Sequence, residues 1–474
     1  MIFDNKQAKA EALGNYRLLD VHRWSDFPEV DNAVDAIYVD LCNDPDFGGN
    51  KTLRKKHIKV VVLDLYAAWL ADPDRYIAYH RTNNQYDSKS RYNILKISYL
   101  TVSVVDALKD YGYVEHHIGY QDRSELGKSH LSRMKVTDKL IDLIKDEHQV
   151  PAHAIQRYKG VETVILRDRD SQGRKIAVEY GDNANTNRMR KALTAYNALL
   201  DKTVITLPEA PEDGIPTSSG NRNIKIDHHD KFVRRIFNNG SFDEGGRFYG
   251  GWWQRIPGDW RVKISMDGAK EGSVEVDYSG LHIVLLYALQ GLDYWKEEDA
   301  REDPYIIDGV EQSPQMRSLL KLILLVIINA KDRDTALGAI RKEINDNPDE
   351  YGWTKTKNTS IEQLMDAFID RHSPIKDYFH SGFGTRLQKI DSIMAGKVIE
   401  TFTSNDIPVL SVHDSFVIHP KHSNELIRVM DSVIYGLNTI FPDIKIKITP
   451  KMKHNCLYDV KCPSGKLMNH YKVL

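Results

Sequence analysis

The segment LSVHDSFVIHP, residues Leu410–Pro420, places a histidine and an aspartate side by side between two apolar runs. The run Ile407–Leu410 leads into the pair and Phe416–Ile418 leads out of it, a pattern that predicts two short strands joined by a tight polar turn. A carboxylate that is buried without a partner costs several kcal/mol, so Asp414 at the inner end of this hairpin needs a partner.

An explanation for Asp414 begins earlier in the chain, in SVEVDYSGLHIVLLYALQG, residues Ser273–Gly291. Val274–Asp277 alternates as a strand does, and Leu281–Leu289 has the apolar character of a buried helix. Asp277 therefore ends a strand just before a helix. Two carboxylates at the ends of neighbouring strands can hold two divalent cations about 4 Å apart, and hard oxygen ligands favour Mg²⁺ over zinc. The alternative is that each aspartate only caps a turn.

The composition is that of an ordinary globular protein, since 41% of the 474 residues are apolar and 28% are charged. The length predicts about three domains, or two large ones. Because the formal net charge is −2, contact with a nucleic acid must come from local basic patches. Cys42, Cys456 and Cys462 lack the spacing of a zinc site and predict free thiols in a reducing compartment.

The first residues show no basic-then-apolar signal pattern, and the longest apolar stretch, Leu322–Ile328, is too short to span a bilayer. We therefore expect a soluble, cytoplasmic protein without a membrane partner. The sequence identifies no protein partner.

Residues 1–150 are predicted to form a mainly helical, winged-helix-like DNA-binding domain. The apolar spacing predicts a helix in 51–80, broken near Asp72-Pro73, and a second helix that starts near Tyr92 and ends at Asp110-Tyr111-Gly112. A hairpin in 113–136 and a helix in 137–147 follow, in the order of a winged helix. The basic residues placed where a wing contacts phosphates are Arg123, Lys128, His130, Arg133 and Lys135. The alternative is a helical domain with an exposed charged hairpin.

Residues 151–230 are predicted to form a connecting, thumb-like region. A hairpin is expected in Glu162–Tyr180 and a helix in 185–200, followed by a loop rich in proline, glycine and serine. Within that loop, DHHD at Asp227–Asp230 has the residue types of metal ligands. In a loop of this kind, an ordinary exposed polar segment is the favoured interpretation.

Two further matches give the carboxylates a family context. DYSGLH at 277–282 resembles the first palm motif, D-Y-S-Q-I-E, of family A DNA polymerases. VHDSF at 412–416 resembles their third motif, V-H-D-E, and still more the H-D-S-F of single-subunit RNA polymerases. The resemblance implies that Asp277 and Asp414 are catalytic and hold two Mg²⁺ ions, with Mn²⁺ as an alternative ion. It also implies that His413 lies beside the primer terminus.

Between these motifs, RSLLKLILLVIINAK at 317–331 resembles the family's triphosphate-binding helix, R-x3-K-x7-Y-G. Arg317 and Lys321 share one helical face, and Lys321 is the only charge in an apolar run. A lysine in such a position either extends to solvent along apolar surface or meets an anion. The resemblance implies that Arg317 and Lys321 hold the triphosphate of the incoming nucleotide, with Asn329 in the place of the tyrosine.

Two more stretches resemble segments of the family that contact nucleic acid. GGRFYGGWWQRIPGDWRVKI at 245–264 is similar to T-G-R…Q-N-I-P, which implies that Arg247 and Gln254 follow the minor groove of the primer-template. GTRLQKIDSIMAGKVIETF at 384–402 takes the place of the helix before the third motif, where Gln388 is a candidate template contact.

The sequence departs from the family where the sugar is chosen. His282 replaces the glutamate that excludes a 2′-hydroxyl in the DNA enzymes, and Asn329 and Leu325 replace two aromatic residues. Ser415 replaces the acidic residue after H-D, as in the RNA enzymes. His282 is still large enough to obstruct a 2′-hydroxyl, and the G-R…Q-x-I-P and D-Y-S segments are of the DNA type, which favours DNA synthesis.

Together these observations predict an α+β right-hand polymerase. Residues 231–474 would form palm and fingers, after the connecting region and the DNA-binding domain. The resemblance covers Phe232–Pro420, under half of the chain. We expect a DNA-directed DNA polymerase in DNA replication that takes primer-template and nucleoside triphosphates; the first 230 residues contain no D-x-E proofreading signature. The alternatives are an RNA polymerase or primase of the same fold, and a DNA-binding initiator or regulator with an inactive palm.

Overall fold

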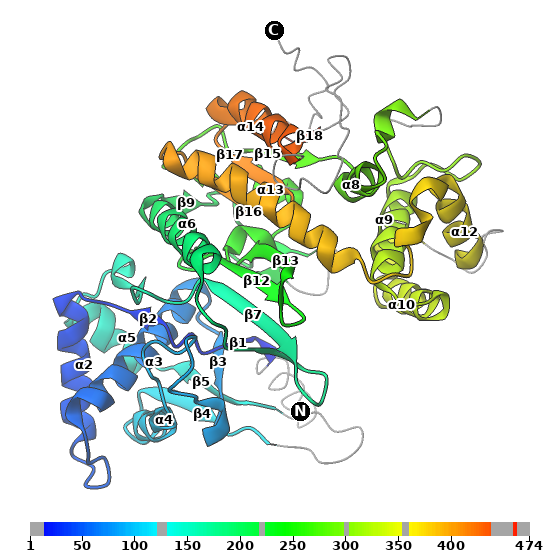
Figure 1. Ribbon diagram of the computed structural model, residues 1–474. Coiled ribbons are helices and arrows are strands. Elements are labelled where there is room, and N and C mark those ends of the chain that lie inside the picture. The colour runs from blue at the N-terminus through cyan, green and yellow to red at the C-terminus, as the bar shows by residue number, and fades with distance from the viewer. Residues whose placement is uncertain are drawn as a thin grey trace. The chain divides into compact units, whose positions relative to one another are not determined.

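The computed structural model describes residues 14–120, 130–217, 223–297, 303–352 and 360–437, and the backbone of 458–461. Helices and strands are mixed along the chain, which confirms the α+β class. The chain divides into two compact units (Figure 1). Unit 1 is residues 1–162 with 225–230, and unit 2 is residues 163–224 with 231–474. The segment 151–230, expected as a connecting region, contributes to both units.

Unit 1 packs helices against a four-stranded sheet. The strand order is β1-β3-β5-β4, with β1 Tyr16–Leu18, β3 Tyr76–Tyr79, β4 Val114–His117 and β5 Ser132–Val136. β1 is parallel to β3 and the other neighbours are antiparallel. The main helices are α2 Pro28–Leu41, α3 Lys51–Ala71 and α4 Leu100–Asp110. No helix among the residues described here has the length and apolar character needed to cross a membrane.

α3 is the central helix of unit 1. It begins after Asn50, whose side chain accepts a hydrogen bond from the backbone N of Leu53 at 3.0 Å, and it ends at Ala71, the break predicted from Pro73. α4 begins at Leu100, later than the sequence predicts. The reason is local, because the amide of Asn93 bonds both the backbone N and the carbonyl of Ile97 and holds 93–97 in a turn.

The hairpin predicted in 113–136 is present as β4 and β5, which pair from Val114↔Val136 to His117↔Arg133. Its tip at 121–129, with the predicted phosphate contacts Arg123 and Lys128, lies outside the described residues. α5 Asp138–Ile141 and a π-helical turn at 142–147 follow in the place of the predicted helix.

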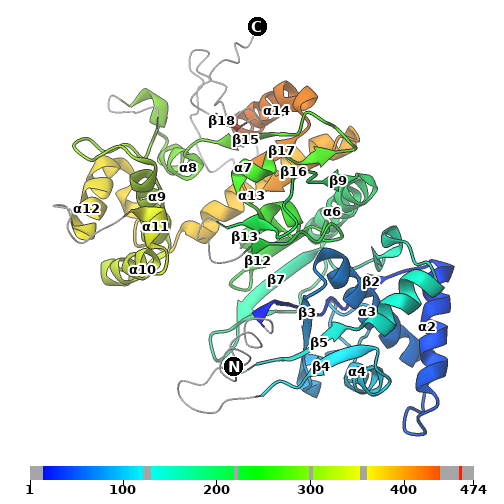
Figure 2. The same cartoon turned by 180° about the vertical axis from the view of Figure 1, so that it is seen from behind.

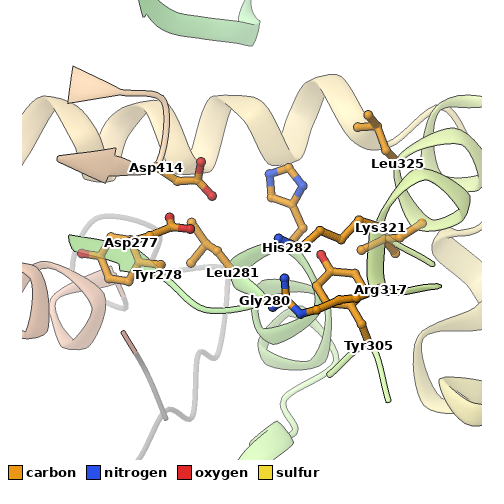
Figure 3. A pocket seen from close by; sticks show the side chains of 11 residues that line it. Asp277, Tyr278, Gly280, Leu281, His282, Tyr305, Arg317, Lys321, Leu325 and Asp414 are labelled. Carbon is orange, nitrogen blue, oxygen red and sulfur yellow. The ribbon is translucent and has the colours of Figure 1, made fainter. Parts of the chain in front are cut away.

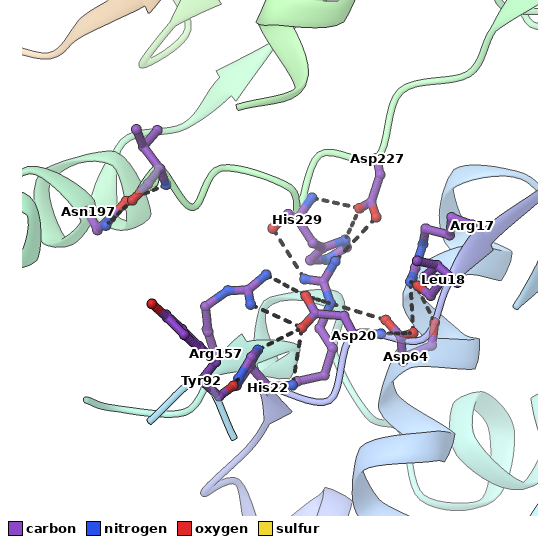
Figure 4. Close-up of polar contacts among 12 residues, drawn as sticks. Arg17, Leu18, Asp20, His22, Asp64, Tyr92, Arg157, Asn197, Asp227 and His229 are labelled. Atoms are coloured by element: carbon purple, nitrogen blue, oxygen red, sulfur yellow. Dashed lines mark hydrogen bonds and ion pairs between the residues drawn. The ribbon is translucent and has the colours of Figure 1, made fainter. Parts of the chain in front are cut away.

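Buried ion pairs connect the elements of unit 1 (Figure 4). Asp64 on α3 is fully buried, and its carboxylate accepts hydrogen bonds from Arg17 Nη1 at 2.7 Å and Arg23 Nε at 3.4 Å. Arg23 Nη2 also donates to Asp227 at 3.3 Å. Since buried charges are stable only when they are paired, this network fixes β1, α3 and the segment 225–230 to one another.

Asp227 opens the DHHD segment, and its carboxylate is already committed within the protein. It accepts a hydrogen bond from the backbone N of His229 at 3.0 Å as well as from Arg23. Burial alone would raise the pKa of Asp227, but the hydrogen bond from the His229 side chain and the charges of Arg23 and Arg17 outweigh it and hold that pKa well below its ordinary value. Asp227 in DHHD therefore forms an ion pair with Arg23, and this pairing explains the residue better than a role as a metal ligand.

The substitution Asp227→Ala should lower the free energy of unfolding by about 3 to 5 kcal/mol, because it leaves Arg23 buried with one carboxylate fewer. Urea unfolding of the full chain measures the effect. The matched control is Asp110→Ala, at an exposed pair with Lys109, which should change stability by less than about 1 kcal/mol. Equal effects of the two substitutions would show that the buried pair is dispensable.

Unit 2 is built on two four-stranded sheets. The first has the order β13-β12-β7-β8, with β7 Val164–Arg169, β8 Lys175–Ala177, β12 Arg234–Asn238 and β13 Ser241–Tyr249. The second has the order β16-β17-β15-β18 and is antiparallel throughout, with β15 Val274–Tyr278, β16 Val409–Val412, β17 Ser415–Ile418 and β18 Tyr458–Lys461. β7 and β8 form the hairpin predicted in 162–180.

Long helices surround these sheets. They are α6 Ala184–Lys202, α8 Leu281–Leu289, α9 Pro314–Asn329, α10 Arg333–Asp346, α12 Ile361–Arg371, α13 Gly384–Ser404 and α14 Ser423–Tyr435. α13 packs against β13, β16, α6, α14 and α9. Figures 1 and 2 show α9, α10 and α12 gathered in one group beside α8, joined to the sheets by α13.

The remaining α-helices and strands are short. They are α7 Gly258–Arg261, α11 Pro348–Tyr351, β2 Arg23–Trp24, β6 Gln156–Arg157, β9 Ile205–Thr206, β10 Ile215–Pro216, β11 Asn223–Ile224 and β14 Ser265–Met266. In the core of unit 2, Trp252 and Trp253 are buried, and Trp253 Nε1 donates to the carbonyl of Ser411 at 3.1 Å.

Candidate active site

Asp414 lies in a two-residue turn between β16 and β17, as the sequence predicts. Val412 pairs with Ser415 across the hairpin, which leaves His413 and Asp414 as the turn. His413 has a φ of +60°, the left-handed conformation that a two-residue hairpin turn needs but that few residues other than glycine adopt.

Asp277 lies on the strand next to this hairpin. β15 pairs antiparallel with β17, and Asp277 is opposite Ser415, the residue after Asp414. Both carboxylates line one pocket, and Figure 3 shows them turned toward the same space. Their proximity is therefore fixed by the register of β15 on β17.

Glu275 shares the face of β15 with Asp277, because side chains alternate along a strand. It is buried, and its Oε1 accepts hydrogen bonds from Arg261 Nη2 at 2.8 Å and from Ser415 Oγ at 2.8 Å. The hydroxyl of Ser415, the residue after Asp414, is therefore bonded to a carboxylate from the neighbouring strand. Its arginine partner makes Glu275 part of the support of the site.

The pocket continues from the carboxylates to α8 and α9. His282 on α8 lines its middle, and Arg317, Lys321 and Tyr305 line the end away from Asp277 (Figure 3). The Tyr305 ring lies 5.3 Å from the Arg317 guanidinium carbon and 5.6 Å from Lys321 Nζ, within range of cation–π attraction. Arg317 Nε also pairs with Asp303.

Tyr305 is held in place from two sides. Gly280, before α8, has a φ of +59°, and a Cβ at this position would lie 2.6 Å from Cγ of Pro304. On the other side, the fully buried His372 has its Nε2 2.9 Å from the carbonyl of Pro304 and its Nδ1 3.3 Å from the hydroxyl of Tyr287. The glycine and the histidine together fix the loop that carries Tyr305.

His372 should make the protein sensitive to acid. Burial, the largest cause, lowers the pKa of His372 to about 4, so the folded protein keeps the ring neutral while the unfolded chain protonates it near pH 6.5. The folded state therefore binds fewer protons between pH 6.5 and pH 4, and its stability falls as the pH drops through this window. A pKa shift of this size corresponds to roughly 3 kcal/mol.

Unfolding of the wild type and His372→Phe at pH 7.5, 6, 5 and 4 measures this effect. The variant should be less stable at pH 7.5, because it loses both hydrogen bonds of the ring, but it should lose less stability than the wild type as the pH falls. If the stability of the two proteins fell equally with pH, His372 would not be the cause of the acid sensitivity.

Arg247 lies outside the pocket wall and contacts His282 from β13. Its Nε donates to both carboxylate oxygens of Asp391 at 3.1 Å, and its Nη2 is 3.2 Å from His282 Nε2. The same His282 nitrogen is 3.0 Å from Asp391 Oδ2. Burial alone would lower the pKa of Arg247, but the hydrogen bonds and charge of Asp391 raise it above its ordinary value.

The other predicted residues lie around the pocket without lining it. His413 packs edge-on against Tyr249 at 5.3 Å between ring centroids, and burial together with the charge of Arg247 lowers its pKa. Asn329 is exposed at the end of α9 and donates to the carbonyl of Leu325. Gln388 is half-buried on α13.

Gln254 is occupied by backbone contacts. Its Nε2 donates to the carbonyls of Phe248 and Ser411 at 3.0 and 2.9 Å, and its Oε1 accepts from the backbone N of Gly250 at 3.1 Å. In the free protein, this amide therefore orders the segment after β13 against the hairpin that carries Asp414.

Two of the five basic residues predicted to contact phosphates in unit 1 are engaged with its own side chains. Arg133 is buried on β5, with its guanidinium 4.2 Å from the ring centroid of Tyr16. Lys135 lies near Glu115 and Asp74, with a nitrogen–oxygen distance of 3.7 Å to each.

Tyr305, Glu275 and Asp391 were not predicted from the sequence. The alternation in VEVDY could have indicated that Glu275 faces the same side as Asp277. Asp391 is one acidic residue in a helix with several polar positions, and its partners lie 144 and 109 residues away in the chain. Tyr305 carries no local signal at all.

The donor set fits Mg²⁺. Asp277 and Asp414 offer hard carboxylate oxygens on one wall of a pocket whose far end is cationic. Within the described ranges, no group of three or more histidine, cysteine, aspartate or glutamate residues forms a metal cage. Mg²⁺ does not need one, because it is commonly bound by one or two carboxylates together with substrate phosphates.

No known family model matches the chain, and no curated protein matches it. Among solved structures, the chain is similar to the POL domain of Pol1 from M. smegmatis, solved in complex with DNA primer-template and dNTP, at 13% sequence identity and a TM-score of 0.29. The match covers 66% of this chain and 59% of that chain, so this chain spans less than two thirds of it. A TM-score this low is no basis for inferring a function.

Proposed function

We propose that this chain is a template-dependent nucleotidyltransferase, and specifically a DNA-directed DNA polymerase without a proofreading exonuclease. The observation that carries the proposal is one pocket with Asp277 and Asp414 at one end and Arg317 and Lys321 at the other. Two carboxylates alone would repel a triphosphate. A nucleoside triphosphate fits this charge pattern when divalent cations lie between its phosphates and the carboxylates.

In this proposal the basic residues of the pocket bind the triphosphate and the acidic residues bind the metal ions. Lys321, Arg317 and the hydroxyl of Tyr305 would bind the non-bridging oxygens of the triphosphate, because cationic donors and hydroxyls match phosphate acceptors. Asp277 and Asp414 would hold two Mg²⁺ ions, with Mn²⁺ as an alternative. When bound, the ions would lower the pKa of the attacking primer hydroxyl and neutralise the leaving pyrophosphate. The protein contributes mainly positioning and charge neutralisation.

In this proposal, the β15–β18 sheet is the palm and the group of α9, α10 and α12 is the fingers. Arg247, Gln254 and Gln388 would contact the primer-template, and His413 would lie by the primer end. Since Gln254 is bonded within the free protein, duplex binding would exchange its hydrogen bonds for contacts with DNA, whereas Arg247 would keep its bonds to Asp391.

Unit 1 would bind duplex DNA as a winged helix, with Arg133 and Lys135 on the hairpin that forms the wing. Its support is the order of elements, in which β3, α4, β4 and β5 follow α3 and the hairpin strand β5 pairs with β3. The winged-helix assignment predicts that the tip of this hairpin contacts phosphates.

His282 is proposed as the residue that selects the sugar. It lines the pocket between the carboxylates and the cations, where the sugar of a bound nucleotide would lie, and its ring would obstruct a 2′-hydroxyl. Asn329, which stands where the family has a helping tyrosine, does not line the pocket. A deoxynucleotide preference would therefore depend on His282 and on whatever fixes its ring.

The substitution Asp414→Asn should abolish synthesis, because it removes a metal-binding charge and keeps the side-chain volume. We expect nucleotide incorporation to fall by about a thousandfold or more. Duplex DNA binding should persist. Primer extension on a DNA template with Mg²⁺, with deoxy- and ribonucleotides in parallel, measures the rate. Asp406→Asn is the control, since Asp406 precedes the same hairpin and is largely exposed.

The outcomes of this experiment separate the alternatives. Full activity of Asp414→Asn would refute the proposal that Asp414 binds a catalytic metal ion. Extension with ribonucleotides, or product without a primer, would assign the chain to RNA synthesis or priming. No product with either nucleotide, together with tight DNA binding, would favour a DNA-binding initiator or regulator.

Lys321→Met tests the cationic end of the pocket. The methionine keeps an unbranched apolar side chain and removes the charge, so the KM for the nucleotide should rise by about 10- to 100-fold. Steady-state kinetics give this value, and Lys342→Met on the exposed face of α10 should leave KM unchanged. An unaltered KM for Lys321→Met would place the triphosphate elsewhere.

A further inference from the structure

Asp391 is a buried carboxylate that connects three separate elements of unit 2. It lies on α13 with 1% of its surface exposed, and it contacts Arg247 from β13 and His282 from α8. An anion at this depth is stable only with its partners in place. The three side chains are therefore already assembled in the free protein.

The contacts with Asp391 restrain the ring of His282. With a proton on Nε2, His282 donates to Asp391 Oδ2 at 3.0 Å, while the guanidinium of Arg247 lies against the same edge of the ring at 3.2 Å. An unrestrained histidine side chain exchanges among several rotamers. Here the ring edge is hydrogen-bonded to a carboxylate that is itself held by two contacts from Arg247 Nε.

Asp391 acts on the incoming nucleotide through His282. His282 lines the pocket together with Asp277, Asp414 and Lys321, whereas Asp391 does not. A ring that is free to turn aside would make room for an additional hydroxyl on the sugar, and a ring fixed across the pocket would exclude it. The Asp391 carboxylate, which holds the His282 ring, therefore determines how strictly the pocket distinguishes a deoxyribose from a ribose.

We propose that Asp391 is a positioning residue that sets the sugar preference of the pocket by fixing His282 against Arg247. The inference rests on the proposed nucleotidyltransferase function. In this inference the residue that holds His282 in place is Asp391 on α13, and not Asn329 on α9.

The test is a double-mutant cycle on the full chain with Asp391→Asn, His282→Ala and the double variant. The quantity measured is kcat/KM for a deoxynucleotide divided by kcat/KM for the matching ribonucleotide, in primer extension with Mg²⁺. His282→Ala keeps the experiment informative if Asp391→Asn folds poorly, because it removes the ring without leaving Arg247 unpaired.

Each single substitution should lower this ratio by about tenfold or more, mainly through faster use of the ribonucleotide. The double variant should show no further loss, because both changes act through one ring. The matched control is Ser392→Ala, a buried neighbour on α13 that bonds Arg235 and not His282. Its ratio should equal that of the wild type.

Different results would overturn different parts of the inference. An unchanged ratio in Asp391→Asn with a changed ratio in His282→Ala would refute the role of Asp391. An equal loss for both sugars, together with a lowered melting temperature, would show that Asp391 only stabilises the fold. A wild type that incorporates neither nucleotide would refute the proposed function and this inference with it.

Discussion

The pairing of β15 with β17 is the constraint on which the candidate site depends. It places Asp277 opposite the residue after Asp414, so one register brings together two carboxylates that are 137 positions apart in the numbering of the chain. A slip of one residue would turn Asp277 to the other face of the sheet. The buried valines beside Asp277 and the apolar strand β17 prevent such a slip, since they would lose their core contacts.

Five acidic residues illustrate two different surroundings in this protein. Asp64, Glu275 and Asp391 are buried and each has an arginine partner, so they hold elements together. Asp277 and Asp414 line a pocket whose cations lie at the other end. A position at the pocket, which is set by the fold, is what separates Asp277 and Asp414 from the other three. It also explains why three letters of local sequence do not reveal which group an aspartate belongs to.

Local patterns predicted the parts of the site that depend on local structure. The hairpin around His413, the strand that carries Asp277 and the lysine face of α9 all follow from alternation or helical periodicity. Asp391 and Tyr305 could not be predicted in this way, because their roles come from contacts across the tertiary structure. Gln254 was predicted from a motif as a nucleic-acid contact, and its bonds to three backbone groups are visible only once the fold is known.

Unit 1 is formed by two separate segments of the chain, which limits where the protein can be cut into independent fragments. Residues 225–230 return to unit 1 after a long excursion through unit 2, and they bring Asp227 to Arg23. A protease that cuts between 163 and 224 would leave unit 1 complete only while both pieces stay associated. A fragment that stops at residue 162 would carry Arg23 without one of its carboxylates. The boundary at which unit 1 can be isolated is therefore set by an ion pair, and not by the order of residues along the sequence.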